Sequence, residues 1–321
     1  MNIIMFDRQG NDFSLEKKTF EEAGASFEVT YFKDTDDFKS LVKGKDVILF
    51  NDAPITREII DSMDKCRLII RYGIGYDNID FKAAGEAGIT VCNAPSYGAL
   101  DVAEHAMALL LSACKHIPLA DKCTRTGAWS PAAVGKVRRL SGKTLGLVGF
   151  GRIARHVAKR CAAFDMNILV YDPFISEDDA TSLGAKKADL ETIYKESDYI
   201  SLHSPLNDDT FHMLSEDEFK LMKNDAVLVN TGRGGLVDEK ALIEALKAGE
   251  IGGAALDVFE EEPISNENPL LKMDNVVLSP HVAWNSYEAV DSLHQEVTAN
   301  VMRFINGEEP ISIVNAPYLK K

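Results

Sequence analysis

The stretch from Lys143 to Pro173, KTLGLVGFGRIARHVAKRCAAFDMNILVYDP, decides the fold of this chain. Its residues run in the order apolar strand, glycine turn, helix, apolar strand and acid, which is the pattern of a dinucleotide-binding unit. Gly149 permits the tight turn, Gly151 lets the backbone approach a pyrophosphate, and the small Ala154 lets the helix pack closely on the strand. The stretch therefore predicts a dinucleotide site.

The helix after the glycines and the acid at the end of the stretch indicate which dinucleotide binds. Arg152 and Ile153 open the helix, whose first N–H groups and positive dipole end suit phosphates. Asp172 stands about 20 residues beyond the glycines, where a carboxylate accepts hydrogen bonds from the adenosine ribose and repels a 2′-phosphate. A glycine triplet alone occurs in many loops, but the complete pattern favours NAD over NADP.

Composition limits the class of protein and its partners. With 321 residues, 45% apolar and 26% charged, the chain is long enough for two domains with their own cores and is typical of soluble globular proteins. The net charge of −15 argues against nucleic acid and anionic membranes as partners, because both would require a basic face.

The cysteines and the N-terminus indicate the compartment. The 5 cysteines include no Cys-x-x-Cys pair, so we expect reduced thiols and no metal site. The N-terminus lacks the basic flank and the length of a signal peptide, and no uninterrupted apolar stretch is long enough to cross a membrane. We therefore expect a cytoplasmic protein.

Short apolar runs alternate with helical patterns in the first part of the chain. Strands are predicted at residues 2–6, 27–32, 47–50, 68–72 and 90–92, and helices at 14–23, 36–42, 56–63 and 81–87. Ser14 and Thr56 are the expected N-caps. This alternation predicts an α/β fold with a parallel sheet and helices on both faces.

The same rhythm continues in the rest of the chain. A one-sided apolar helix is predicted over residues 98–116, and irregular chain is expected after Pro118 as far as Val134. Beyond the dinucleotide stretch, strands are predicted at 199–202, 226–230, 253–256 and 276–278, and helices at 215–222, 239–247 and 287–305. We therefore expect two doubly wound parallel-sheet domains.

Three of the later strands are followed by residues that can perform chemistry. Arg233, Glu262 and His281 come after the strands at 226–230, 253–256 and 276–278. The carboxyl ends of parallel strands meet at one sheet edge, so these groups are expected beside the cofactor turn. Together they supply what hydride reduction of a 2-keto acid needs: a guanidinium for the substrate carboxylate, an imidazole for the proton and a carboxylate that orients the imidazole.

Each of these residues also has a simpler interpretation. His281 alone is compatible with a solvated loop, residues 260–262 with a solvated acidic turn, and Arg233 between glycines with a flexible surface loop. Their joint placement favours function. His203 follows a strand and is a candidate for lining the adenosine pocket. The remaining histidines in helical patterns are predicted to be surface or packing residues, and they are His105, His116, His156 and His294.

Several separated motifs, in the same order as here, are typical of one family. They are RYGIGYDNID at 71–80, NAP at 93–95, GFGRI at 149–153, YDP at 171–173, NTGRG at 230–234, DVFEEEP at 257–263 and SPH at 279–281. Over almost its whole length the chain resembles the D-isomer-specific 2-hydroxyacid dehydrogenase family. The resemblance implies that Arg233, Glu262 and His281 are catalytic and that NAD is the cofactor.

The resemblance also implies a domain plan. Residues 1–97 and 286–321 would form a flavodoxin-like substrate-binding domain, and residues 98–285 an inserted Rossmann domain that binds NAD. Residues 98–134 would supply the dimerisation arm of a homodimer. The implied cofactor contacts are Gly149, Gly151, Arg152, Ile153, Asp172, His203, Thr210, Thr231, Gly232, Arg233, Asp257 and His281. The implied substrate contacts are Arg71, Tyr72, Gly73, Ile74, Gly75, Arg233 and Trp284.

Departures from the family's branches limit the substrate. Arg71 matches one basic position that phosphoglycerate dehydrogenases use, but residues 51–54 lack their second arginine, and no regulatory domain follows the last helix, so a short 3-phosphoglycerate dehydrogenase is a disfavoured alternative. Trp284 resembles the C-terminal-binding-protein branch, which leaves an NAD(H)-sensing corepressor as the other alternative. The intact Arg233, Glu262 and His281 favour the enzyme, and Glu262 argues against a formate dehydrogenase, where a glutamine pairs with the histidine.

Overall fold

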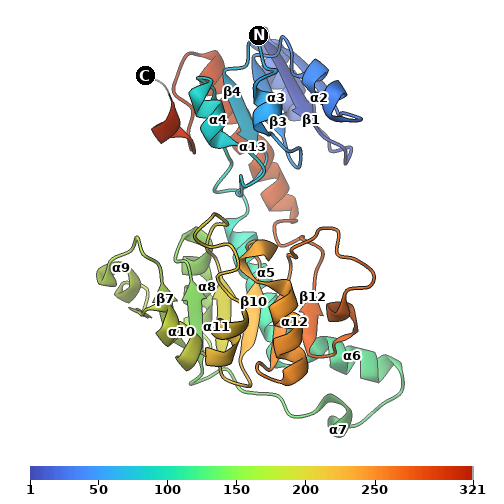
Figure 1. The fold of residues 1–321 in the computed structure, drawn as a ribbon, viewed down its shortest axis with the longest axis vertical. Helices are drawn as coiled ribbons and strands as arrows, with labels where there is room; N and C mark the ends of the chain where they lie inside the picture. Colours follow the sequence, from blue (N-terminus) through green and yellow to red (C-terminus); the bar gives the residue numbers. More distant parts are fainter. Residues whose placement is uncertain (320–321) are drawn as a thin grey trace. The chain divides into compact units, whose positions relative to one another are not determined.

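The computed structural model of the chain describes residues 1–319 and divides into two compact units. The first unit joins Met1–Gly98 to Ser286–Lys321, and the second is the continuous segment Ala99–Asn285. Each unit is a parallel sheet covered by helices, so the predicted fold class is confirmed (Figure 1).

The first unit contains a five-stranded sheet. Its elements are β1 (Asn2–Phe6), α1 (Ser14–Glu22), β2 (Ser26–Thr30), α2 (Thr35–Leu41), β3 (Val47–Phe50), α3 (Arg57–Ile60), β4 (Leu68–Arg71), α4 (Phe81–Glu86), β5 (Thr90–Cys92), α13 (Tyr287–Ile305) and the 3-10 helix η3 (Ala316–Tyr318). The strand order is β2-β1-β3-β4-β5, and all the pairs are parallel. This is the flavodoxin-like order, which reverses between β1 and β3.

Each face of this sheet buries its own core. Ile48 of β3 packs with Phe38 of α2 on one face, and the next residue, Leu49, packs with Phe20 of α1 and Val297 of α13 on the other. Successive side chains of a strand point to opposite faces, which explains why the central strand β3, buried on both faces, is apolar throughout. Although α13 lies near the end of the chain, it runs beside the N-terminal strands (Figure 1).

The second unit contains a seven-stranded sheet. Its elements are α5 (Ala99–Cys114), α6 (Ile117–Arg125), α7 (Pro131–Val134), β6 (Thr144–Val148), α8 (Arg152–Ala162), β7 (Asn167–Tyr171), α9 (Glu177–Thr181), β8 (Ala185–Lys187), α10 (Leu190–Glu196), β9 (Tyr199–Leu202), α11 (Glu216–Leu221), β10 (Val227–Asn230), η1 (Gly234–Leu236), α12 (Glu239–Ala248), β11 (Gly253–Leu256), η2 (Pro269–Lys272) and β12 (Val276–Leu278). The order β12-β11-β10-β9-β6-β7-β8 is that of a Rossmann sheet with one added strand, and it reverses between β6 and β9.

The structure of the region after residue 98 corrects one expectation. Helix α5 belongs to the core of the second unit, because its buried side chains, Ala106 and Leu110 among them, pack with Val157 of α8. Within the segment 98–134, which stays the predicted dimerisation arm, α6 and α7 have no buried residues (Figure 1). The region after Pro118 is helical, because this proline lies in the first turn of α6, where its missing N–H costs no hydrogen bond.

Other local expectations were incomplete. Ser14 is the first residue of α1 rather than its N-cap, and its N–H donates to Asp12 Oδ1 at 2.9 Å. The short elements α9, β8 and α10 were not predicted, since their sequences carry few apolar residues. Within residues 1–319, none of the helices is both long and apolar enough to span a membrane.

Candidate active site

The glycine turn lies where the strand order of the second unit reverses. Gly149 follows β6 with φ +88°, a conformation that favours glycine. A Cβ atom at this position would lie 2.7 Å from the carbonyl carbon of His203, which follows β9. Only glycine fits there, so the turn passes between β6 and β9 at the point where doubly wound sheets bind ligands.

Helix α8 starts directly after this turn. Gly151 is its N-cap residue and has no side chain to bond the first-turn N–H groups, which lack acceptors within the helix. A Cβ atom at Gly151 would have no neighbour within 4 Å, so there is space beside the helix N-terminus. Positive N–H groups facing open space fit the pyrophosphate of a dinucleotide.

Asp172 follows β7, the strand next to β6. Its Oδ2 accepts a hydrogen bond from the N–H of Phe150 at 2.8 Å, and its Oδ1 accepts one from the N–H of Phe174 at 2.8 Å. Each oxygen keeps a lone pair for another donor. The carboxylate is thus fixed beside the glycine turn and can still accept bonds from ribose hydroxyls.

Three further residues predicted to contact the cofactor lie in loops after β9 and β10. His203 Nε2 lies 2.9 Å from the hydroxyl of Ser201, and burial lowers the pKa of His203 to about 4, so the ring is neutral at pH 7. Thr231 Oγ1 is buried and has no hydrogen-bond partner within residues 1–319, so it is available to a ligand. Thr210 donates its hydroxyl proton to Pro205 O at 2.7 Å and orders its own loop.

The loop after β10 carries Arg233 and contacts the loop after β11. Asn230 closes it, since its Oδ1 accepts from Gly232 N–H at 3.0 Å and its Nδ2 donates to Arg233 O at 2.9 Å. A Cβ atom at Gly234 would lie 1.9 Å from the carbonyl carbon of Phe259. Glycine therefore lets the two loops meet.

Glu262 and His281 form a hydrogen-bonded pair. His281 Nδ1 lies 2.6 Å from Glu262 Oε2, and Glu262 Oε1 accepts from the N–H of Phe259 at 3.0 Å. Burial acts to raise the pKa of Glu262, but these hydrogen bonds and the nearby positive charges, including Arg233, lower it overall. Glu262 is therefore ionised at pH 7. The bond through Nδ1 directs Nε2 of His281 away from the carboxylate, and 39% of the His281 side chain is exposed.

The loop that carries His281 is organised by Asp257. His281 has φ +54°, and its N–H donates to Asp257 O at 2.7 Å. The Asp257 side chain, with 1% exposed, accepts from the Ser279 hydroxyl at 2.6 Å and from the N–H groups of Val282 at 3.0 Å and Ala283 at 2.9 Å. Burial acts to raise the pKa of Asp257, but these hydrogen bonds lower it, so a charged carboxylate holds the loop.

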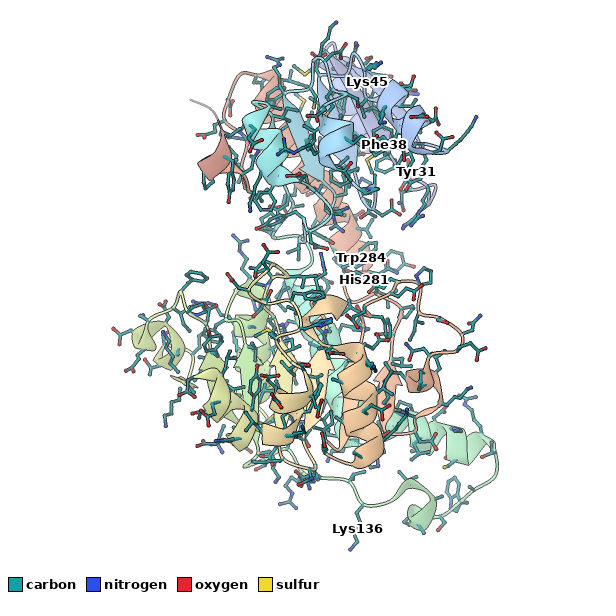
Figure 2. All side chains as sticks on the ribbon, viewed as in Figure 1. Tyr31, Phe38, Lys45, Lys136, His281 and Trp284 are labelled. Atoms are coloured by element: carbon teal, nitrogen blue, oxygen red, sulfur yellow. The ribbon has the colours of Figure 1, made fainter. Side chains whose placement is uncertain are left out.

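Trp284 closes the same loop. Its indole N–H donates to His281 O at 3.2 Å, and Figure 2 shows the two side chains close together. Trp284 is therefore hydrogen-bonded beside His281, and its contact with the substrate stays a prediction.

His105, on α5, extends the network around Asp257. Its Nε2 lies 2.9 Å from Ser279 Oγ and 3.4 Å from Asp257 Oδ1. The sequence assigned His105 only a surface or packing role, and no sequence signal identified it, because the contact depends on how α5 packs against β12.

The first unit holds the remaining predicted substrate residues, in the glycine loop after β4. Gly73 has φ +147°, and a Cβ atom there would lie 1.2 Å from Arg71 Nη1, so the guanidinium lies against the loop. Asn93 Nδ2 donates to Ile74 O at 2.6 Å and ties the loop down. The N–H groups of Ile74 and Gly75 make no hydrogen bond in the described part of the chain, so they are available to an anion.

Comparison with known proteins identifies the class. Residues 107–283 match the model of the NAD binding domain of D-isomer specific 2-hydroxyacid dehydrogenases, and this segment is more than half of the chain. The chain belongs to this family. The matched segment contains the glycine turn, Asp172 and the pair formed by Glu262 and His281.

Particular relatives differ in how much of their length the chain covers. It is 44% identical over 270 residues to a glyoxylate reductase of Korarchaeum cryptofilum, with 83% of this chain and 81% of that protein covered. It is 39% identical over 282 residues to a D-3-phosphoglycerate dehydrogenase of Archaeoglobus fulgidus, with 88% of this chain covered, but it spans only about half (53%) of that relative. A solved D-lactate dehydrogenase of Aquifex aeolicus, in complex with NAD and lactic acid, is 29% identical, has a TM-score of 0.90 and is matched over 98% of this chain and 100% of its own.

Proposed function

We propose that the protein is an NAD-dependent oxidoreductase that interconverts a small 2-keto acid and the corresponding D-2-hydroxy acid. The observation that carries the proposal is the pair formed by His281 and Glu262, at 2.6 Å, at the same sheet edge as the glycine turn and Asp172. Membership of the family and the similarity to a glyoxylate reductase support the substrate class.

The side chains divide the reaction between them. When bound, NAD(H) supplies hydride chemistry. His281 donates a proton from Nε2 to the keto oxygen in the reducing direction and takes it back in the oxidising direction. Glu262 holds the ring through Nδ1 and balances the charge of the imidazolium. Arg233 binds the substrate carboxylate in a fork and polarises the adjacent carbonyl.

We assign NAD binding to the second unit and substrate binding to the first. The space beside Gly151, the buried hydroxyl of Thr231 and the fixed carboxylate of Asp172 support the first assignment. The N–H groups of Ile74 and Gly75 beside Arg71 support the second, because they suit a carboxylate. Small acids such as glyoxylate and hydroxypyruvate are the proposed substrates.

We also propose that the protein is a homodimer formed through the arm of α6 and α7. The arm buries no residue of its own and exposes 88% of Trp129 and 54% of Ile117. Large apolar side chains on a projecting segment are typical of interfaces.

Replacing His281 tests the chemical assignment. We expect His281→Ala to lower kcat for keto-acid reduction about 100-fold or more, the scale of a lost general acid, while the Kd for NADH stays unchanged. Steady-state kinetics with NADH and a panel of 2-keto acids, and a fluorescence titration of NADH, provide the two measurements.

The chain offers a matched control for this variant. His212 also pairs with a glutamate, Glu260, in neighbouring loops of the same unit. His212→Ala should keep most of the activity. If His281→Ala retains a near-normal kcat, His281 is not the acid. If no 2-keto acid is turned over by the wild type, and a partner protein binds only with NADH present, the corepressor-like alternative replaces the enzyme.

A further inference from the structure

A carboxylate is buried in the first unit with only half of its hydrogen-bonding capacity used. Glu16, on α1, is 0% exposed. Its Oε1 accepts from the hydroxyl of Tyr72 at 2.9 Å and lies 2.5 Å from Nδ1 of His294, on α13. Its Oε2 is also buried and has no hydrogen-bond partner within residues 1–319. A buried polar atom left in this state calls for an explanation.

The surroundings make the charge of Glu16 costly without its partner. The ring of Phe13 packs edge-on against His294, at 5.4 Å between centroids, and against Tyr72, at 5.8 Å. These side chains join the core that α1 and α13 form on one face of the sheet. In such an apolar setting a carboxylate is stable only when a positive group pairs with it, and removing that group leaves an uncompensated buried charge.

The groups that face His294 favour its charged form. The hydrogen bond that His294 donates to Glu16 raises the pKa of His294, burial opposes this, and the negative charges of Glu16, Asp12 and Asp291 add to the increase. Burial and the adjacent Glu16 raise the pKa of Tyr72 well above its ordinary value, so its hydroxyl stays protonated and donates. The cluster therefore favours the protonated form of His294 beside Glu16 and the neutral form of the Tyr72 phenol.

Tyr72 connects this cluster to the glycine loop. Its backbone N–H donates to Phe50 O at 2.7 Å, and its side chain ends on Glu16. The next residue, Gly73, begins the turn that presents the N–H groups of Ile74 and Gly75. Tyr72 is thus fixed at both ends immediately before the N–H groups that suit an anion, and a shift of its side chain moves the start of the loop.

We infer that Glu16 and His294 are positioning residues for substrate binding: the charged pair holds the phenol of Tyr72, and Tyr72 holds the N–H groups of residues 74 and 75 in place for the substrate carboxylate. The inference rests on the proposed function of the loop. It also makes substrate affinity depend on pH. Below the pKa of His294 the pair is intact, and as the pH rises through that raised pKa the proton leaves, Glu16 loses its counter-charge and the hold on Tyr72 weakens.

Two conservative variants test the role of the pair. Tyr72→Phe removes only the hydroxyl and should raise KM for glyoxylate about 10-fold, the effect of one lost hydrogen bond to a charged group, with kcat within about 2-fold and an unchanged Kd for NADH. In the wild type, KM should rise between pH 6 and pH 9 in step with the titration of His294, followed by NMR of its ring. His294→Gln keeps a hydrogen-bond donor but cannot titrate, so the KM of this variant should not show the rise between pH 6 and pH 9.

A variant elsewhere in the same unit separates positioning from stability. Phe38 is 1% exposed and lies in the core on the opposite face of the sheet. Phe38→Leu should lower Tm and leave KM and its pH profile unchanged. The inference is overturned if Tyr72→Phe has a normal KM, if His294→Gln keeps the wild-type pH step, or if Phe38→Leu shifts KM as much as Tyr72→Phe does.

A readout without turnover distinguishes this inference from the proposed function. If the wild type reduces no 2-keto acid, the proposed function fails, and hydrogen exchange of the peptide that contains residues 73–76 then decides the inference. Exchange about 10-fold faster in Tyr72→Phe and Glu16→Gln than in the wild type shows that the cluster holds the loop. Equal exchange in all three proteins shows that it does not.

Discussion

We expect the carboxylate of Asp172 to determine the preference for NADH over NADPH. Backbone N–H groups on both sides, those of Phe150 and Phe174, hold it next to the glycine turn. Asp172→Ser removes both the acceptor and the negative charge. We expect the Kd for NADH to rise about 10-fold, since hydrogen bonds to charged groups contribute about 1.5–3 kcal/mol, and the discrimination against NADPH to fall by at least as much. Fluorescence titrations with both nucleotides measure the two constants.

Asp178, on α9, provides the control for Asp172→Ser. Asp178→Ser makes the same change of charge at an exposed position nearby and should leave both constants unaltered. A wild type that already binds NADPH more tightly than NADH would show that Asp172 does not select the cofactor.

Individual residues of the site differ in how far the sequence predicts them. Arg233, Glu262 and His281 were placed correctly after their strands, because strand ends are easy to locate in apolar runs. The contact between His105 and Ser279 was not predictable, since it joins residues 174 positions apart. The backbone angle φ of +54° at His281 was not predictable either. This conformation costs about 1–3 kcal/mol, and the hydrogen bonds of the loop to Asp257 maintain it.

The helices after residue 115 show where element prediction failed and why. Irregular chain is predicted after Pro118, but this proline lies in the first turn of α6, and the helix continues beyond it. Strands such as β3 and β9 had the predicted bounds, because a parallel sheet buried on both faces requires continuous apolar runs. Helices α6 and α7 carry no such signal, since neither buries a residue in its own unit and their sequences therefore show no apolar face.

The arm predicts the oligomeric state. Trp129→Glu places a charge at the most exposed apolar position of the arm, where a desolvated interface would not accept it. We expect the protein to change from dimer to monomer in light scattering after size exclusion. Phe174→Glu, at a side chain that is 95% exposed elsewhere in the same unit, should remain dimeric. A wild type that is already monomeric at micromolar concentration would contradict the assigned role of α6 and α7.

Both units place their candidate functional groups at the carboxyl edge of a parallel sheet. In the second unit the glycine turn lies between β6 and β9, where the strand order reverses, and in the first the glycine loop follows β4, two strands from β1. In open α/β sheets, ligands bind outside the carboxyl ends of the strands. This rule allows the candidate site to be predicted from the sequence. That rule does not determine which ionisable side chains pack inside each unit. The second unit contains carboxylates with lowered pKa values, and the first contains a histidine with a raised pKa.

This difference predicts opposite responses to pH. In the second unit, the buried Asp198 and Asp257 and the partly exposed Glu262 have lowered pKa values, because their hydrogen bonds and nearby charges outweigh the effect of burial. A lowered folded pKa contributes stability above the unfolded value of about 4, and this stability is lost as the pH falls through the folded value. In the first unit, the raised pKa of His294 contributes stability that is complete below about 6.5 and is lost as the pH rises through the folded value.

We therefore expect acid to weaken the second unit first and alkali the first unit first. Limited proteolysis with mass spectrometry during heating of the whole protein reports the midpoint of each unit from its own peptides. Between about pH 5 and pH 2 the melting midpoint of the second unit should fall further in the wild type than in Asp198→Asn. Between about pH 6.5 and pH 9 the melting midpoint of the first unit should fall about 2–4 °C further in the wild type than in His294→Gln. These variants remove the titrating group, so effects of net charge cancel in the comparison. If His294→Gln and the wild type respond identically to alkali, the buried pair of Glu16 and His294 does not set the stability of the first unit, because its stabilisation must disappear with the proton that creates it.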